Sequence, residues 1–459
     1  MFTTLVIKPK TSTGLPSGKF VSEEEIIIWK ARQTDSYYSS EFQRVNSNAN
    51  SFLADPEDDY YSGPSSEVVV QWSTPEPQFE GTKILAAAFM FMLNQDAAIG
   101  AAVKKQLQKQ FRDPKVDFSN RTRWTTAVND INPGFIVSEW LQRLLYAYVY
   151  SMNLFNEDER VEAKRWFFNS GKFFVDNTVP RLNGLYSDKA NYVLKSENLS
   201  GEIMYDGGPK VPENALWYNN RRGQMLTFAT LAGLLTGEKE LIDSGVNFVK
   251  EWLMFATFPD GTTSEFERWG SSTPYLGWAY ASYSPHNAIM LADALARSGD
   301  ASLFGFHTSK GSAGTAGGDK SILTVIKHQI SYAAGRTNRT IQGKKISPFN
   351  SDWNASFDTW YSQGNIWYED QQIKEGYKRN FPTNNVATAG GHNSYSGVWG
   401  MLPSVKIMYF DLEGKVDVYP GRVVVRKDLT LHQKLLFLLL GIIIGIILKI
   451  LLSWFIISN

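Results

Sequence analysis

From Gly81 onward, apolar residues recur at helical spacing in one segment after another, and this repetition constrains the fold more than any other feature. The segment that starts at Gly134 is the clearest, since its apolar residues lie three and four positions apart. Asn156 and Glu159 have the spacing of a capping box at a helix start. Further helices are expected at 84–111 (a pair), 221–236, 239–256, 285–298, 320–335 and 399–410. Successive antiparallel helix pairs predict a mostly α fold, an (α/α) toroid with an inner and an outer ring of helices.

Two regions of the chain lack this helical periodicity. In residues 1–78, short strands are expected at 21–30 and 67–72, with a polar stretch between them. We expect this region to be either an irregular arm that contacts a partner or a cap on the helical domain, which spans 79–420. Residues 340–395 also show no helical period, and so long a segment predicts a functional loop, a lid over the cleft of the toroid.

The longest apolar run of the chain is 435–457, which contains a single charge at Lys449. As a helix it would span roughly 34 Å, enough to cross a hydrocarbon core of ~30 Å. Because the run is apolar on every face, it predicts a transmembrane tail anchor rather than a core helix. A basic linker, 421–434, precedes it. Basic residues stay on the cytoplasmic side, so the main domain is expected there, with the lipid bilayer as one partner.

Charge and cysteine content exclude several classes of function. Lys plus Arg and Asp plus Glu number 46 each, so no basic excess indicates a nucleic-acid partner. The absence of cysteine excludes disulfides, thiolate nucleophiles and Cys-ligated metals. The five histidines lack the spacing of metal ligands, so neither a metal ion nor another cofactor is expected.

Two short elements between Asn214 and Arg297 have the residue types that an acidic sugar would need. The first opens a predicted helix and contains Trp217, Asn219, Asn220, Arg221 and Arg222. The second follows Asp260-Gly261 and contains Glu265, Arg268, Trp269, Tyr275 and Tyr283. Amides and arginines can neutralise a sugar carboxylate, and a tyrosine can move a proton beside it.

The order and spacing of these elements resemble the alginate lyase family of polysaccharide lyases. In that family Asn-Asn-His opens a helix that closes at Thr-Gly, and here Asn219-Asn220-Arg221 opens the helix that closes at Thr236-Gly237. The resemblance extends from about 84 to 299 and includes the turn with Glu265 and Arg268 and the segment with Tyr283. It implies an (α/α) toroid that binds an acidic polysaccharide and cleaves it at a uronate by β-elimination.

The resemblance also implies roles for individual residues. Asn219, Asn220 and Arg268 would stabilise charge on the uronate carboxylate, and Tyr283 would transfer the protons. Arg221 stands where the family has its histidine, and a guanidinium cannot act as a base. The expected substrate-binding residues are Arg221, Arg222, Trp217, Trp269, Glu265, Tyr275 and His392, of which Tyr275 is the alternative proton-transfer tyrosine and His392 could replace the missing histidine from the lid.

Structural roles are the alternative for the same residues. Asn219 and Asn220 could simply cap the helix that follows them. Arg268 could pair with a neighbouring glutamate on the surface, and Tyr283 could be an ordinary core tyrosine. The tryptophans suit core packing as well as sugar stacking.

Three functions fit these expectations. The first is a membrane-anchored polysaccharide lyase, and the second is a catalytically inactive toroid with a structural or glycan-binding role. Arg221 and the expected cytoplasmic topology favour the second, and they suit a protein of a virion. A third is a glycoside hydrolase that uses Glu265 and Asp358. The expected partners are an acidic polysaccharide, the bilayer, further copies of the chain and virion proteins.

Overall fold

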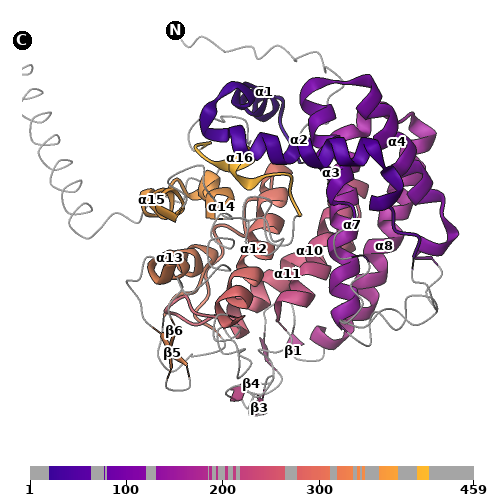
Figure 1. The fold of residues 1–459 in the computed structure, drawn as a ribbon. Helices are drawn as coiled ribbons and strands as arrows, with labels where there is room; N and C mark the ends of the chain where they lie inside the picture. The colour runs from indigo at the N-terminus through magenta and orange to yellow at the C-terminus, as the bar shows by residue number, and fades with distance from the viewer. Residues whose placement is uncertain are drawn as a thin grey trace, which may run out of the picture. The chain divides into compact units, whose positions relative to one another are not determined.

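The computed structural model describes residues 20–63, 77, 80–119, 131–183, 186–188, 193–194, 202–204, 210–212, 218–263, 276–310, 318–333, 339–341, 344–346, 361–380 and 401–412. The chain divides into two compact units, Met1–Arg422 and Val423–Asn459, and every described residue belongs to the first. Within these residues, thirteen α-helices and three small antiparallel hairpins confirm the mostly α class (Figure 1).

The helices are α1 (Glu23–Ala31), α2 (Ser39–Ala54), α3 (Thr82–Asn94), α4 (Ala97–Arg112), α7 (Ile131–Ser151), α8 (Glu157–Asn183), α10 (Asn220–Thr236), α11 (Lys239–Phe255), α12 (Leu276–Arg297), α13 (Ile322–Ala333), α14 (Tyr361–Tyr368), α15 (Gln371–Asn380) and α16 (Val405–Tyr409). The hairpins pair β1 (Tyr186–Asp188) with β2 (Val193–Leu194), β3 (Glu202–Met204) with β4 (Lys210–Pro212), and β5 (Arg339–Ile341) with β6 (Lys344–Ile346).

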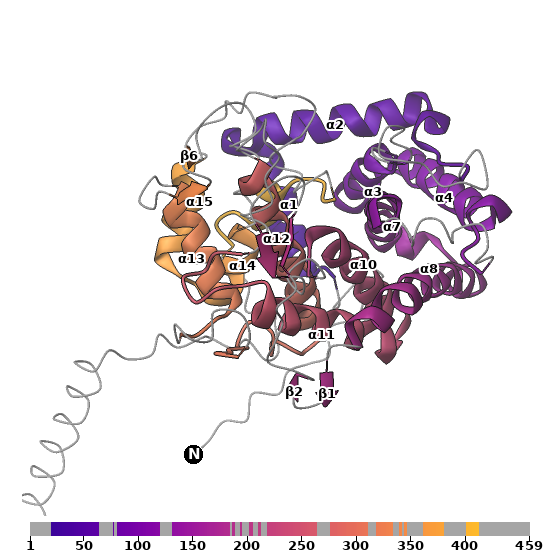
Figure 2. The ribbon, with the colours of Figure 1, turned by 90° about the horizontal axis from the view of Figure 1, so that it is seen from below.

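Neighbouring helices along the chain pack in pairs: α3 with α4, α7 with α8, α10 with α11, α12 with α13, and α14 with α15. The first members of these pairs also contact one another in chain order, from α3 through α7, α10 and α12 to α14 (Figures 1 and 2). Helix α14 contacts α16, which contacts α1 and α2, and both of these contact α3. The succession of helix contacts therefore returns to its starting point.

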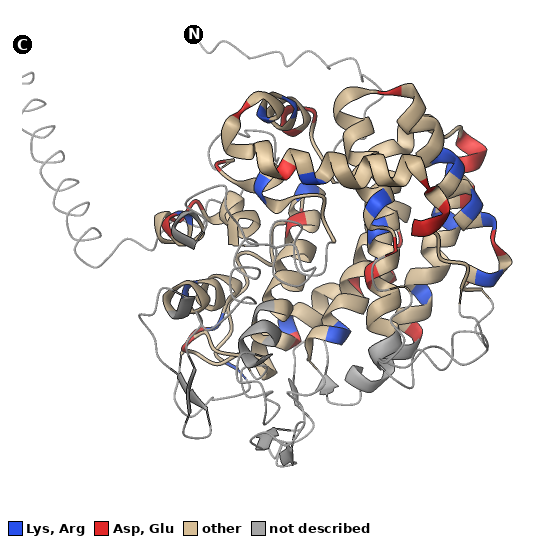
Figure 3. Cartoon of the chain, in the orientation of Figure 1, with Lys and Arg blue, Asp and Glu red and all other residues tan. Residues whose placement is uncertain are grey.

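Helices in this central succession are covered on nearly all sides. Every residue of α3 from Ile84 to Leu93 is buried, and so is every residue of α14. By contrast, α4 keeps charged residues on its outer face (Figure 3). Its Lys104 and Arg112 form ion pairs of 2.8 Å with Glu159 and Glu162 of α8. An enclosed helix needs no polar face, so its sequence carries little helical periodicity.

This enclosure explains an error in the sequence analysis. Residues 340–395 were predicted to lack helices, whereas α14 and α15 lie within them. Helix α14 shows no amphipathic period because it is buried all round, and α15 is only ten residues long. The predicted irregular lid is wrong for this part of the segment, since α14 belongs to the core.

The strand predicted at 21–30 is also wrong, because these residues form α1. Ser22 and Glu25 make a capping box: the Glu25 amide donates to Ser22 Oγ at 3.2 Å, and the Ser22 amide donates to Glu25 Oε2 at 2.9 Å. The polar stretch after it contains α2. This start signal and the packing of α1 outweigh the β propensity of the isoleucines at 26–28. The strand predicted at 67–72 lies outside the described residues.

Helix α1 is held against the segment 401–412, far along the chain. Trp29 Nε1 donates to the Met408 carbonyl at 2.8 Å, and Arg32 donates to the carbonyls of Ile407 and Phe410. Arg44 of α2 donates to the Pro403 carbonyl at 2.6 Å. The two ends of the described helical region are thus fastened to each other.

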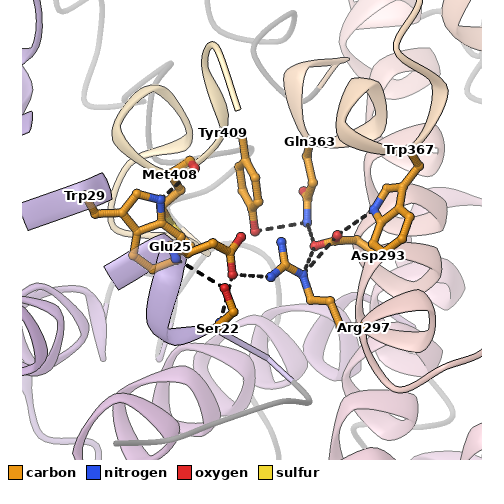
Figure 4. A network of polar contacts seen from close by, with 9 residues as sticks. All are labelled: Ser22, Glu25, Trp29, Asp293, Arg297, Gln363, Trp367, Met408 and Tyr409. Carbon is orange, nitrogen blue, oxygen red and sulfur yellow. Dashed lines mark hydrogen bonds and ion pairs between the residues drawn. The ribbon is translucent and has the colours of Figure 1, made fainter. Parts of the chain in front are cut away.

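A buried polar network, here the closure network, completes this junction and links α1, α12, α14 and α16 (Figure 4). Arg297 lies 2.5 Å from Glu25 Oε2 and 3.0 Å from Asp293. Asp293 accepts hydrogen bonds from Gln363 Nε2 at 2.9 Å and Trp367 Nε1 at 2.7 Å. The same Gln363 amide lies 3.2 Å from the Tyr409 hydroxyl. The members of the network are Glu25, Asp293, Arg297, Gln363, Trp367 and Tyr409.

Among the residues that the structure describes, no helix has both the length and the hydropathy needed to cross a bilayer. The predicted anchor at 435–457 and the linker at 421–434 lie outside those residues.

Candidate functional site

Five of the predicted site residues fall within the described ranges: Asn219, Asn220, Arg221, Arg222 and Tyr283. The others lie outside them, namely Trp217, Glu265, Arg268, Trp269, Tyr275 and His392, as does Asp358. The described five come from the start of α10 and the second turn of α12, two helices that pack on each other.

Asn219 is the N-cap of α10. Its side chain accepts a hydrogen bond from the Arg222 amide at 3.0 Å, so the capping role that the sequence allowed is present. Asn220 begins the helix, and its carbonyl accepts from Asn287 Nδ2 of α12 at 3.1 Å. Asn219, Asn220 and Arg222 are buried, whereas Arg221 is half-buried.

Helix α12 begins nine residues earlier than the sequence predicted, at Leu276 instead of 285, so Pro285 lies inside it. A proline has no amide hydrogen to donate to the carbonyl one turn earlier, that of Ala281. Gln329 of α13 replaces the missing donor, with its Nε2 3.1 Å from that carbonyl. This substitute hydrogen bond allows the helix to continue through the proline.

Tyr283 faces a carboxyl group. Its hydroxyl donates to Glu139 Oε1 of α7, and both side chains are buried. Glu139 Oε2 lies 3.7 Å from Arg143 Nη2, an ion pair too long for a hydrogen bond. Burial, aided by the neighbouring Glu139, raises the pKa of Tyr283 well above its ordinary value.

Burial likewise raises the pKa of Glu139 to about 8, although Arg143 and the Tyr283 hydrogen bond oppose this shift. Because its own pKa is raised, Tyr283 is neutral at physiological pH. A proton-abstracting tyrosine would need a lowered pKa, so the shift of Tyr283 runs opposite to what that role requires.

Around Tyr283 and the start of α10, polar side chains connect each pair of the helices α7, α10 and α12. Gln224 Nε2 of α10 donates to Gln142 Oε1 of α7 at 2.7 Å, and Gln142 Nε2 lies 3.6 Å from the sulfur of Met290 in α12. Together with the Tyr283–Glu139 and Asn287–Asn220 contacts, every pair of these helices shares a polar contact. We call the group Glu139, Gln142, Gln224, Tyr283 and Asn287 the three-helix junction.

Glu139, Gln142 and Gln224 were not among the site residues predicted from the sequence. Glu139 and Gln142 lie off the apolar stripe of α7 and so had the pattern of solvent-facing residues. In the structure α7 is enclosed, and both side chains are fully buried. The available signal was the charged pair Glu139 and Arg143, one turn apart in a strongly apolar helix.

His286 is a further buried titratable group next to the junction in sequence. Within the described part of the chain, neither ring nitrogen has a hydrogen-bond partner, and burial lowers the pKa of His286 to about 3. It is therefore neutral at physiological pH. In the same described part, no group of three or more His, Asp or Glu side chains is placed to hold a metal ion.

No family model matches this chain, and no curated protein matches it. The relation to alginate lyases therefore stays a hypothesis based on the order and spacing of the motifs.

Proposed function

We propose that this chain is an (α/α) toroid related to the alginate lyases, anchored in a membrane through 435–457, which binds an acidic polysaccharide without cleaving it. The toroid is supported by the helix contacts. Helices α3, α7, α10, α12 and α14 contact one another in order, each has its own partner helix, and the succession closes through α16, α1 and α2.

Polysaccharide binding is supported by the start of α10. Asn219 and Asn220 match the paired amides of the lyase motif, and Arg221 and Arg222 add two cationic side chains in the first turn of the helix. Cationic groups and a helix N-terminus both favour an anionic ligand. Arg221, as the half-buried member, is the side chain that a polymer would reach first.

The observation that carries the absence of cleavage is the buried pair of Tyr283 and Glu139. β-Elimination needs a base that accepts the C5 proton, but the Tyr283 hydroxyl already donates its proton to a carboxyl group. Burial keeps this tyrosine neutral. The family's histidine, the other base, is replaced by Arg221, which stays protonated.

The test uses the full-length chain in detergent micelles with a panel of uronic acid polymers. Ultraviolet absorbance of the unsaturated uronate product reports cleavage, and titration calorimetry reports binding. We expect saturable, salt-sensitive binding to at least one polymer with no rise in absorbance. Tyr283→Phe should leave the absorbance as flat as in the wild type, and Arg221→Gln should weaken binding by about tenfold, the loss of one charge-assisted contact.

A rise in absorbance that Tyr283→Phe abolishes would instead establish a lyase. That second candidate is favoured by the proximity of Asn220 and Tyr283, which are joined through Asn287 one turn from the tyrosine. Binding to none of the polymers, by a chain whose circular dichroism shows it folded, would leave a structural toroid.

A further inference from the structure

We propose that the three-helix junction is an internal hydrogen-bonding site that receives the hydroxyl groups of one sugar unit. This inference rests on the proposed polysaccharide binding, and it names the part of the sugar that the protein recognises inside the helical domain. The site is distinct from the arginines at the start of α10, which would face the carboxylate.

The junction contains one unsatisfied oxygen from each of its three helices. Within the described residues, Glu139 Oε2 of α7, Gln224 Oε1 of α10 and Asn287 Oδ1 of α12 are buried and have no hydrogen-bond partner, and the guanidinium of Arg143 lies 3.7 Å from the first of them. The other polar atom of each side chain makes a contact across to a neighbouring helix. Those contacts hold the three side chains where α7, α10 and α12 pack on one another.

Such atoms are costly, because a buried polar atom that has lost its water gains nothing in return. Native proteins keep few of them, and each calls for an explanation such as a ligand or an internal water molecule. Local rules of this kind are broken most often at functional sites. What sets these three oxygens apart from the other unsatisfied atoms of the described core is that one comes from each of three helices that contact one another, and this is the arrangement that an occupant of the junction would use.

The chemistry of the three oxygens defines this occupant. The two amide oxygens only accept hydrogen bonds, so the occupant must donate to them. The carboxyl of Glu139, whose pKa burial raises to about 8, carries a proton at neutral pH and can donate. A hydroxyl group both donates and accepts, whereas a carboxylate would be repelled by the amide oxygens. Sugar hydroxyls and water share this chemistry, and the experiment separates them.

The burial of the junction has a kinetic consequence. Glu139, Gln224 and Asn287 are at most 1% exposed, so a sugar reaches them only after covering groups have moved. Association is therefore expected to be slower than at a preformed surface site, because binding must wait for a conformational change.

The experiment compares two variants of the full-length chain in detergent, using a uronic acid polymer that the wild-type chain binds. The double variant Gln142→Met and Gln224→Met replaces both partners of a buried amide pair with apolar groups of similar size, which is close to neutral for stability. Gln110→Met in α4 is the control, since Gln110 is equally buried but bonds the Tyr61 carbonyl outside the junction. Calorimetry gives the affinity, and urea unfolding gives the stability.

We expect the double variant to bind about tenfold more weakly than the wild type, while Gln110→Met loses stability and keeps its affinity. Unchanged affinity in the double variant would show that the junction holds water only, which overturns the inference and leaves the proposed function standing. If the wild-type chain binds no polymer, the proposed function fails, and this inference fails with it.

A second measurement needs no variant and so does not depend on folding. The same polymer acetylated on its C2 and C3 hydroxyls keeps its carboxylates but loses the donors that the junction requires. We expect it to bind the wild-type chain about tenfold more weakly than the unmodified polymer. Equal affinity for the two polymers would overturn the inference.

Discussion

Between α7 and α12, the Tyr283 hydroxyl and the Glu139 carboxyl meet, and both side chains are buried. Burial disfavours the charged form of each group, so the pKa of both is raised. The two residues are 144 positions apart, and only the fold reveals that a carboxyl faces the tyrosine. At the scale of the single residue, burial and this contact raise the pKa of the tyrosine, whereas a proton-abstracting tyrosine needs a lowered one.

The substitution Glu139→Gln should change how stability depends on pH. The folded-state pKa of Glu139, about 8, is raised above the ordinary 4.5, so the folded protein keeps a proton that the unfolded chain releases. The contribution of this proton is complete below pH 4.5 and is lost as pH rises towards 8. Between pH 5 and pH 7 we expect the wild type to lose about 2–3 kcal/mol relative to the variant.

Urea unfolding of both chains at pH 5, 6 and 7 measures this difference. His286 titrates in the opposite direction, since its lowered pKa destabilises the folded state as pH falls below 6.5, but it is present in both chains and largely cancels. If the free energy of unfolding of the wild type and of Glu139→Gln changed with pH in parallel, the raised pKa of Glu139 would be contradicted.

At the scale of the element, α12 is a helix that continues through a proline because another helix supplies the missing hydrogen-bond donor. The sequence placed the helix start at Pro285, since proline is common in a first turn. That expectation is local, whereas the Gln329 amide that satisfies the Ala281 carbonyl comes from α13. The misplaced boundary therefore follows from a tertiary contact.

Gln329→Leu should cost about 1–3 kcal/mol of stability, because it leaves the Ala281 carbonyl buried without a donor. In a Pro285→Ala background, residue 285 regains an amide hydrogen that can bond this carbonyl, so the cost of Gln329→Leu should fall. A double-mutant cycle measured by urea unfolding gives the coupling. An equal cost in both backgrounds would show that Gln329 does not compensate for the proline.

The elements that the sequence predicted well are those with local signals. The helices expected at 221–236 and 239–256 are α10 and α11, and the capping box of Asn156 and Glu159 forms as predicted. The sequence also indicated that Asn219 and Asn220 stand at the start of a helix, and they are the N-cap and the first residue of α10. Glu139 escaped because it lies off the apolar stripe of α7 and so had the pattern of a solvent-facing residue, and helix α14 escaped because enclosure removes the polar face on which periodicity depends.

At the scale of the whole described helical region, the succession of helix contacts returns to its start only through contacts between the first and last helices. The closure network places Arg297 between Glu25 and Asp293, with all three side chains buried. A buried ion pair contributes little net stability by itself, but removing one partner leaves the others uncompensated.

Arg297→Met should therefore cost about 3–5 kcal/mol, because two buried carboxylates lose their cation. Arg112→Met is the matched control, since the Arg112–Glu162 pair is partly exposed at the surface and should contribute less than about 1 kcal/mol. Urea unfolding of both variants gives the comparison. A similar small cost for the two arginines would show that the closure network does not hold the first and last helices together.

The hydrogen bond from Trp29 to the Met408 carbonyl joins residues 379 positions apart. A ribosome that adds about 5–20 residues per second needs roughly 20 to 75 seconds to synthesise the chain between them. Throughout that interval α1 has emerged without the segment that bonds Trp29, and of its two partner helices only α3 is already made. A chaperone that binds nascent chains would therefore have a long-lived target on the face of α1 that later meets 401–412.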